Sequence, residues 1–458
     1  MKNLKMGLIY LILLSCLFAC DSFVEVDLPN SQLTGVTVFE NRTTANAAMV
    51  DIYSKLRDSG LITGHASGTG TTIGLYADEL TYYGLGGDSS DHVFKNSLLA
   101  TNPVVSEFWN KGYNQIYCAN AVIAGVQNSA SLAVADKDQF TGEGLFVRAL
   151  VHFYLLNIYG DIPYVTTTEY EQNKLVSRMP VNEVYQHIIS DLNRAITLLP
   201  EDYITAERVR PNKSTAYALL ARVFLYTGKW AEAANAASAV LNNPAYIWEN
   251  DLDKIFLKES TTTIWQFKPK LDGTNTDEAG VFIFISGPPP SVGLSADMIA
   301  SFENGDQRKE HWTAAVTNDT KTWYHSNKYK QNTNTGVSVE YSILFRLAEQ
   351  YLIRAEARAK QGDLIGAKED LNKIRNTAGL GNTMAQSADE IVGAILKERR
   401  FEFFTEYGHR FFDLKRTATI NATLAASKPG WETHDVLWPL PEAELFANPN
   451  LKPQNPGY

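Results

Sequence analysis

Residues 218–241 read ALLARVFLYTGKWAEAANAASAVL, and residues 352–375 read LIRAEARAKQGDLIGAKEDLNKIR. Both stretches place small residues at three matching offsets: Ala221, Gly228 and Ala233 in the first, and Ala355, Gly362 and Ala367 in the second. Small side chains let two antiparallel helices approach closely, and glycine permits the turn between them. The repeat therefore predicts two helical hairpins of one kind, against the alternative of an unrelated bundle with coincidental alanines and glycines.

The segments around these hairpins also have helical periodicity. Residues 180–199 are the clearest case, because apolar residues recur at spacings of three and four between Pro180 and Pro200. Further helices are predicted at about 43–57, 104–127, 140–159, 343–360, 364–375 and 388–407. The predicted fold class is mainly α, a tetratricopeptide-like helical-hairpin scaffold into which a loop-rich irregular subdomain is inserted.

Two segments lack this periodicity. Residues 61–103 are rich in Gly, Thr, Ser and Asp, and residues 242–342 hold short alternating runs and a Gly287-Pro288-Pro289-Pro290 break. Both are typical of long loops. We therefore expect one domain over residues 36–458, with helical scaffold at about 36–60, 104–241 and 343–416 and loop-rich ligand-binding parts at about 61–103 and 242–342.

The N-terminus indicates export. Two lysines precede an apolar run over residues 6–18 that is too short for a permanent membrane span, which is typical of a secretory signal. The run ends in Leu17-Phe18-Ala19-Cys20, which resembles a lipobox whose cysteine receives diacylglycerol. Residues 1–19 are predicted to be a lipoprotein signal peptide, and residues 20–35 a lipidated tether. The alternative is an ordinary signal peptide that happens to end near a cysteine.

Net charge and cysteine content narrow the range of expected ligands and exclude an intramolecular disulfide in the mature chain. The formal net charge is −10, and loss of the two lysines in the signal leaves −12. Such an acidic chain is a poor binder of polyanions, so nucleic acid is not the expected partner. Of the 3 cysteines, Cys16 would leave with the signal and Cys20 would be acylated, so Cys118 has no partner for a disulfide.

Catalytic and metal-binding motifs are absent from the sequence. It has no His-Glu-x-x-His, Cys-x-x-Cys or Gly-x-Ser-x-Gly, and the glycine-rich stretch 64–74 lacks a phosphate-binding lysine. Residues 272–277 (DGTNTD) faintly resemble a calcium loop but lack its closing glutamate, so a surface turn is the favoured interpretation. The charges between Glu398 and Arg416 alternate in sign, which favours a structural network of mutually neutralised pairs over acid–base catalysis.

The two loop-rich segments carry aromatic residues in the company of polar ones. Sugars offer only their C–H faces for apolar contact, so a sugar binder uses aromatic planes flanked by amides and carboxylates. This pattern predicts a ligand surface made of two clusters: Asp78 with Tyr82 and Tyr83, and Trp312 with Trp323 and Tyr324. The alternative for each ring is loop packing. Trp109 and Trp265 lie in regular elements and are predicted to be core residues.

Several motifs, in order along nearly the whole chain, resemble those of the SusD/RagB family. They are RALVHFY (148–154) with YGDIP (159–163), the 178–199 helix, RLAE (346–349), LNKIR (371–375), ERRFE (398–402), GHRFFDLKR (408–416), WPLP (438–441) and QNPGY (454–458). Tyr407 departs from the simplest Glu-Gly form of the motif at that point. On these motifs the chain is identified as a member of the family.

The resemblance implies a function as well as a fold. It implies an outer-membrane, cell-surface lipoprotein that captures oligosaccharides and delivers them to a SusC-like TonB-dependent transporter without catalysis. No cofactor is expected beyond the lipid on Cys20, and a structural calcium ion has only weak support. Family counterparts of the two aromatic segments contribute ligand-contacting rings, although no residue-level motif transfers. Three other interpretations stay open: peptide capture by such a lid, a surface glycoside hydrolase, and a scaffold that binds no ligand itself.

Overall fold

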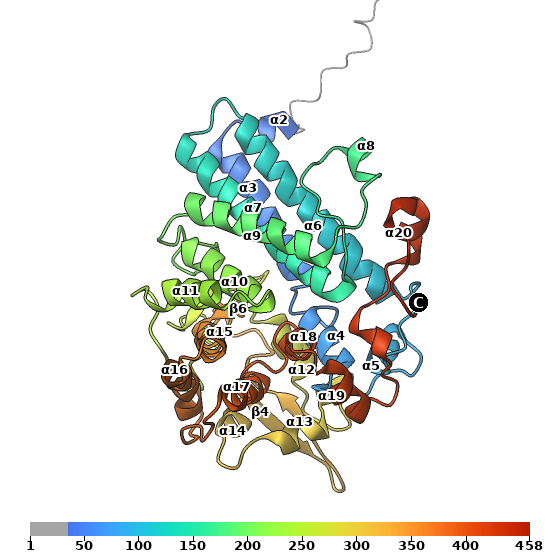
Figure 1. Ribbon diagram of the computed structural model, residues 1–458, viewed down its shortest axis with the longest axis vertical. Helices are drawn as coiled ribbons and strands as arrows, with labels where there is room; N and C mark the ends of the chain where they lie inside the picture. Colours follow the sequence, from blue (N-terminus) through green and yellow to red (C-terminus); the bar gives the residue numbers. More distant parts are fainter. Residues whose placement is uncertain (1–34) are drawn as a thin grey trace, which may run out of the picture.

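The computed structural model describes residues 35–458 and is predominantly helical with a few short strands (Figure 1), which confirms the predicted fold class. The predicted signal peptide, Cys20 and all but the last residue of the predicted tether lie outside the described residues. The first helix, α2, spans Gly35–Val38 and packs on α3 and α6.

The two repeated stretches form helical hairpins. The first hairpin consists of α10 (Lys213–Tyr226) and α11 (Trp230–Leu241), and the second of α15 (Leu347–Lys360) and α16 (Leu364–Thr377). The turn glycines have positive φ angles, +67° at Gly228 and +87° at Gly362, as the sequence predicted for these positions. Helix α15 packs on α11, and alanines from both hairpins, among them Ala221, Ala233 and Ala357, share one apolar cluster, while Ala355 and Ala367 lie in a neighbouring one.

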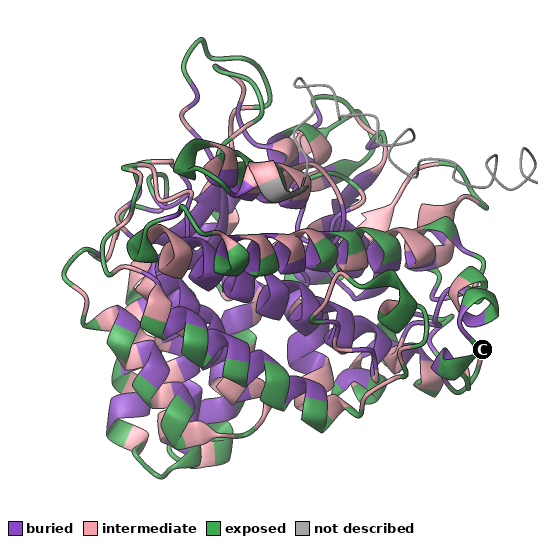
Figure 2. Cartoon of the chain, turned by 90° about the horizontal axis from the view of Figure 1, so that it is seen from above, coloured by how far each residue is buried: buried purple, intermediate pink, exposed green. Residues whose placement is uncertain are grey.

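The remaining long helices extend this array on both sides. They are α3 (Arg42–Asp58), α6 (Pro103–Asn128), α7 (Val134–Tyr159), α9 (Val181–Leu198) and α17 (Ala388–Glu402). Neighbours pack in the order α3, α6, α7, α9, α10, and α17 packs on α15 and α16. Most of these helices bury one face and expose the other (Figure 2), as amphipathic periodicity requires. Helix α7 differs, because every residue from Phe140 to Tyr159 is buried.

Three two-stranded antiparallel sheets occupy the irregular parts. Strand β1 (Leu80–Tyr82) pairs with β3 (Val292–Leu294), β2 (Thr263–Phe267) with β6 (Ser342–Arg346), and β4 (Thr313–Thr317) with β5 (Thr322–Ser326). The short helices of residues 242–342 are α12 (Asp277–Phe282), α13 (Ala296–Ser301) and α14 (Arg308–Trp312). Strands β4 and β5, α13 and α14 lie at the lower end of the molecule (Figure 1).

Residues 61–103 are more regular than the sequence predicts. They contain α4 (Thr69–Tyr76) and α5 (Ser89–Phe94) besides β1, so the expectation of long loops is wrong for these residues. Helix α4 has weak helix formers but is almost wholly buried, and its two glycines permit close contacts. A Cβ at Gly70 would lie 2.8 Å from the Thr405 carbonyl oxygen, and one at Gly74 would lie 3.0 Å from Leu80. Tertiary packing imposes this helix.

The C-terminal residues close one side of the helical array. They form α18 (His409–Arg416), α19 (Ile420–Ser427) and α20 (Glu442–Ala447), with short 3₁₀ turns at Thr433–Val436 and Pro449–Leu451. A shorter helix, α8 (Tyr170–Asn173), follows α7 and lies near α20 (Figure 1). Within residues 35–458, none of the helices has the length and apolar character needed to cross a membrane.

The charges of residues 398–416 form buried ion pairs, which confirms their predicted structural role. Arg399 contacts Asp413 at 2.6 Å, and Arg416 bridges Asp413 at 2.8 Å and Glu356 at 2.6 Å. Several partners come from distant segments that the sequence did not point to, namely Arg308, Arg346, Lys328 and Glu356. Burial keeps the pKa of His409 well below its ordinary value, so this imidazole is neutral.

Candidate functional site

Parts of the two predicted aromatic clusters, Tyr82 with Tyr83 and Trp323 with Tyr324, lie in segments that meet at strand β3. Strand β1 pairs with β3 in the register Thr81 to Gly293, and the backbone N–H of Tyr83 donates to the Ser291 carbonyl at 2.7 Å. Strand β5 packs on the same short strand. A Cβ at Gly293 would lie 3.4 Å from ring atom Cε2 of Tyr83 and 3.3 Å from the Tyr324 carbonyl oxygen. Residues more than two hundred positions apart in sequence thus become neighbours, and we call this region the β3 surface.

The tyrosines of the β3 surface are partly exposed and differ in their polar contacts. Tyr82 donates its hydroxyl to the Asp88 carboxylate, and burial together with this carboxylate raises the pKa of Tyr82 to about 12. Burial also raises the pKa of Tyr83. Within residues 35–458 the hydroxyls of Tyr83 and Tyr324 have no hydrogen-bond partner. Both hydroxyls are therefore free to donate to and accept from a ligand.

Trp323 contributes less open surface than the sequence predicted. It is 7% exposed, its ring packs on Gly287, and the Lys321 ammonium lies 5.5 Å from its centroid. Its indole N–H is buried and has no hydrogen-bond partner among the described residues. Two residues before Gly287, the side chain of Ile285 is 91% exposed, an open apolar group that the sequence did not mark.

Trp312 does not belong to the β3 surface, so the prediction that it lines a ligand surface is wrong in this structure. It is fully buried, its indole N–H donates to the Leu252 carbonyl at 3.0 Å, and its ring contacts Phe256 edge-on. The Lys328 ammonium lies 5.2 Å from its centroid. Trp312 is the last residue of the five-residue helix α14, and its ring lies in the core. For Trp312 the alternative interpretation, a ring that packs inside the protein and contacts no ligand, is the right one.

Asp78 lies two residues before β1, and two arginines hold its carboxylate. Arg410 donates to both of its carboxylate oxygens, at 2.9 and 2.7 Å, and Arg400 lies 3.3 Å away. Burial alone would raise the pKa of Asp78, but the two guanidinium groups keep it below its ordinary value. The neighbouring Glu79 is wholly buried, and burial, with a contribution from Asp78, raises its pKa to about 8. Asp78 is thus a structural carboxylate at the edge of the site.

An open groove of about 530 Å³ runs beside β1. Its lining residues come from β1, α5, α13 and residues 427–430, and they include Asp78, Thr81 and Lys428. The Lys428 ammonium donates to the Leu75 carbonyl at 2.7 Å and lies over the Phe94 ring. Burial lowers the pKa of Lys428 to about 7. No sequence motif marks this groove, because its walls come from four separate segments.

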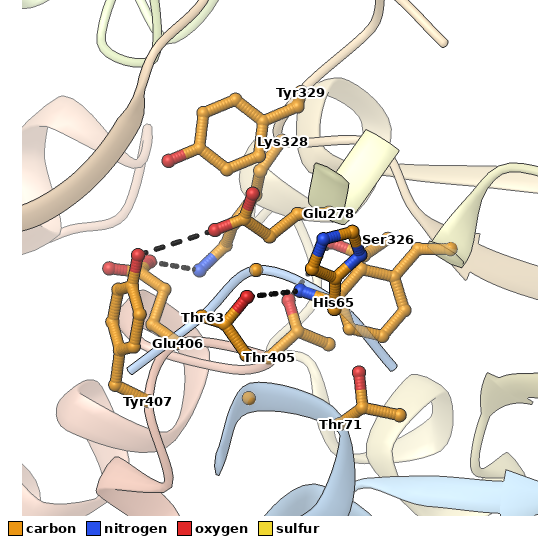
Figure 3. Close-up of a pocket in the computed structure, with 13 residues that line it drawn as sticks. Thr63, His65, Thr71, Glu278, Ser326, Lys328, Tyr329, Thr405, Glu406 and Tyr407 are labelled. Carbon is orange, nitrogen blue, oxygen red and sulfur yellow. Dashed lines mark hydrogen bonds and ion pairs between the residues drawn. The ribbon is translucent and has the colours of Figure 1, made fainter. Parts of the chain in front are cut away.

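A second, small polar cavity is lined by two carboxylates, Glu278 and Glu406 (Figure 3), which at first sight resemble a catalytic pair. Burial raises the pKa of Glu278 to about 7, and Tyr407 donates to it at 3.2 Å. Glu406 accepts from Lys328 and from Arg346, the latter at 2.9 Å. The space between them is about 20 Å³, enough for one water molecule and too small for a sugar ring. We interpret this cavity as part of the buried ion network.

The faint calcium motif of residues 272–277 is a turn in the structure. The Thr276 hydroxyl caps helix α12, and the Asn275 side chain accepts from the backbone of Val339 and donates to the Thr333 carbonyl. In the part of the chain that the structure describes, no group of three or more His, Cys, Asp or Glu side chains is placed to hold a metal ion.

The fold and the β3 surface define a class of protein: a helical-repeat scaffold whose irregular loops present partly exposed aromatic rings. Comparisons with known proteins show the family to which this scaffold belongs. Residues 87–225 match a family described as "Starch-binding associating with outer membrane", and residues 297–458 match the SusD family. SusD-like protein P2 of Formosa agariphila is 30% identical over 416 residues, which cover 78% of this chain and 81% of that protein. The chain belongs to the SusD/RagB family.

Solved structures share the fold across nearly the whole chain. A SusD superfamily protein from Bacteroides vulgatus aligns with a TM-score of 0.78 at 21% identity, covering 92% of this chain and 100% of that one. A laminarin-binding SusD-like protein aligns with a TM-score of 0.77 at 24% identity, with the same coverage of both chains. At these identities the similarity concerns the fold.

Proposed function

We propose that this protein is a cell-surface, lipid-anchored glycan-binding protein that captures oligosaccharides on the β3 surface and delivers them to a SusC-like TonB-dependent outer-membrane transporter. It acts by binding and not by catalysis. The observation that carries the proposal is the meeting of Tyr82 and Tyr83 with Trp323 and Tyr324 at β3. Membership of the SusD/RagB family and the laminarin-binding relative of the same fold support it.

The chemistry of the β3 surface suits a neutral sugar. Tyr83 and Tyr324 are partly exposed, so their rings offer planes for the C–H faces of a pyranose. Their hydroxyls have no partner within residues 35–458 and can exchange hydrogen bonds with sugar hydroxyls. The net charge of −10 disfavours a polyanionic ligand. The rings provide the stacking contacts and the free hydroxyls provide the hydrogen bonds that carbohydrate recognition requires.

A binding assay tests the β3 surface. The soluble form that starts after Cys20 is screened on a glycan array, and the best ligand is titrated into wild type and into the double variant Tyr83→Ala/Tyr324→Ala. Loss of two stacking rings should weaken binding by about tenfold or more, since each aromatic contact contributes about 1 kcal/mol. The matched control Tyr83→Phe/Tyr324→Phe keeps both rings and separates stacking from hydrogen bonding by the hydroxyls.

Three outcomes would reject the proposal. If the alanine variant binds the glycan with unchanged affinity, the β3 surface does not bind the ligand. Binding of peptides and of no glycan on the array would assign the chain to peptide capture. Release of shorter sugars from a glycan by the purified protein would make it a hydrolase, which requires a carboxylate pair flanking the scissile bond.

The anchor has a test of its own. Cys20 lies outside the described residues, so the proposal rests on the lipobox-like residues 17–20 and on the apolar run before them. Cys20→Ala should abolish incorporation of labelled palmitate and release the protein from outer-membrane fractions, because several buried acyl chains are needed for stable attachment. Retention of Cys20→Ala in the membrane without label would reject the lipid anchor.

A further inference from the structure

A second ring-lined groove lies between α6, α8 and α20, in helical parts that the sequence analysis treated as scaffold. It has a volume of about 450 Å³, within the range of about 300–1,000 Å³ that is usual for small-ligand sites. Helices α8 and α20 lie close together over the same side of α6, whereas the β3 surface lies among the elements at the lower end (Figure 1). We call it the α6 groove.

One wall of the α6 groove is an aromatic stripe on a single helix. Trp109, Tyr113 and Tyr117 follow one another at intervals of four residues, so they project from one face of α6. Successive Cα atoms on such a stripe are separated by about 6 Å along the helix axis. Trp109 and Tyr113 form the inner part, and Tyr117 at the outer end is 50% exposed. Tyr170 of α8 faces the stripe and is 72% exposed.

The inner rings are held rigidly. The Tyr113 hydroxyl donates to the Pro163 carbonyl at 2.9 Å, and the ring centroids of Trp109 and Tyr113 are 4.8 Å apart. Trp109 also contacts Tyr159 edge-on at 5.2 Å. The inner wall of the groove is therefore fixed before a ligand arrives and loses little conformational entropy on binding.

Polar side chains are interleaved with these rings. Asn110 is exposed and its amide makes no hydrogen bond within residues 35–458. Asn173 donates to the Thr167 carbonyl at 2.8 Å, which leaves its amide oxygen available. Glu444 is a half-buried carboxylate, and burial raises its pKa while a hydrogen bond from Trp109 opposes the shift. Lys174 lies 5.5 Å from the Tyr170 centroid and is paired with Glu171.

We propose that the α6 groove is a second carbohydrate-binding site, for an uncharged stretch of oligosaccharide that stacks on Tyr117 and Tyr170 and hydrogen-bonds to Asn110, Asn173 and Glu444. The inference deepens the proposed function and rests on it. A docked protein is disfavoured because the groove is concave, of small-molecule size and lined with amides that have free hydrogen-bonding positions. An anionic ligand is disfavoured by the Glu444 carboxylate, since the nearby Lys174 already has a carboxylate partner.

Two sites on one chain change how a long glycan binds. Once one site holds part of the polymer, the other meets a high local concentration of the same chain, so the combined affinity exceeds that of either site. A short oligosaccharide that cannot reach both sites gains nothing from the second. The inference therefore predicts that affinity depends on ligand length.

Four forms of the detergent-solubilised mature chain test the inference: wild type, the loop variant Tyr83→Ala/Tyr324→Ala, the groove variant Tyr117→Ala/Tyr170→Ala, and the combination of both. Each is titrated with glycans of the array, with laminarin and short laminari-oligosaccharides as the first probes. The groove variant should bind the long glycan about tenfold more weakly than wild type. The loop variant should keep residual binding that disappears in the combined variant.

Controls separate stacking from misfolding. Tyr117→Phe/Tyr170→Phe keeps both rings and should bind as wild type does, because no described residue hydrogen-bonds to either hydroxyl. Val134→Ala and Met384→Ala remove exposed apolar side chains elsewhere and should leave binding unchanged. Unfolding midpoints of all variants show whether the fold is kept.

The results distinguish this inference from the proposed function. If the groove variant binds as wild type and the combined variant equals the loop variant, the second site is overturned while the β3 surface stands. If only the groove variant loses binding, the β3 surface is rejected and the α6 groove stands. If wild type binds no glycan, both are rejected. If glycan binding is kept but a transporter no longer copurifies with the groove variant, the groove is a protein interface and the inference is overturned.

Discussion

Arg346 lies between Glu402 and Glu406 in the interior, and the guanidinium side chain is only 3% exposed. It donates to Glu406 at 2.9 and 3.0 Å and also pairs with Glu402. Burial by itself would raise the pKa of Glu402, but Arg346 and Arg308 hold it below its ordinary value. Each charge in this network is tolerated in the interior because the opposite charge is in contact with it.

Removing Arg346 should therefore be costly. Arg346→Met leaves Glu402 and Glu406 with fewer partners in a buried setting, and breaking such a pair costs about 3–5 kcal/mol. Denaturant unfolding followed by circular dichroism measures the free energy of unfolding. Lys254→Met, which removes an exposed ion pair with Asp251, is the matched control and should leave stability unchanged. Equal stability of the two variants would contradict a structural role for the network.

The raised pKa of Glu79 predicts that the stability of the fold depends on pH. Its pKa is raised to about 8, mainly by burial, from an ordinary value of 4.5. Between these values the folded protein holds the proton and the unfolded chain releases it, so this contribution to stability is complete below pH 4.5 and declines as the pH rises toward 8. Glu79→Gln cannot ionise. Its stability relative to wild type should grow from pH 5 to pH 8, by up to about 1.4 kcal/mol per unit, and then level off.

Urea unfolding at pH 5, 7 and 9 checks the Glu79 prediction. Glu183→Gln, a change at an exposed position of α9, serves as the control, and its difference from wild type should not follow this profile. A difference between Glu79→Gln and wild type that stays constant over the whole range would show that Glu79 is ionised in the folded protein near neutral pH.

Single residues also show where sequence reasoning fails. Composition did not distinguish Trp312 from Trp323, yet Trp312 is fully buried and Trp323 is 7% exposed, while Ile285, which the sequence did not mark, is 91% exposed. The direction of a ring depends on partners such as Leu252 and Gly287, which are distant in sequence. Trp109 was predicted to be core and is 3% exposed, but it also lines the α6 groove. Residue type alone does not separate these cases.

At the scale of elements, the hairpin turns offer a paired test of backbone conformation. Gly362 has a φ of +87° and no heavy atom within 4 Å of an added Cβ, so Gly362→Ala should cost about 1–2 kcal/mol from backbone strain alone. Gly393 has equal space but lies within α17, so Gly393→Ala should stabilise the protein by about 0.5–1 kcal/mol. Thermal or urea unfolding of both variants measures the difference. Changes of the same sign would contradict the hairpin geometry.

Helices whose own residues carry a periodic pattern could be predicted from the sequence. The apolar stripe of residues 180–199 predicted α9 at Val181–Leu198, because that helix buries the face that the spacing marks. The matching alanines and glycines predicted the α10–α11 and α15–α16 hairpins, because small residues allow close helix packing and glycine allows the turn. Helix α4 was missed because its Gly- and Thr-rich sequence has no such stripe, and contacts with residues near Thr405 determine its conformation.

At the scale of the whole molecule, the candidate sites are products of long-range assembly. Strand β3 joins Tyr83 to Tyr324, and α20 reaches back over α6 to complete the α6 groove. The sequence predicted most of the aromatic residues of the β3 surface. It did not predict that they lie side by side, because no local sequence pattern indicates that β1 pairs with β3. The family motifs predicted the helical scaffold, and the folding of that scaffold brings the segments of each site together.

The central claim is that sugar binds at the β3 surface, and a crystal structure of the soluble chain with its best array glycan tests it most directly. The account predicts pyranose rings in van der Waals contact, about 4.0–4.5 Å, with the rings of Tyr83 and Tyr324. It also predicts that Trp312 stays buried. A glycan seated elsewhere, with both tyrosines free of ligand in a crystal where they are open to solvent, would contradict it.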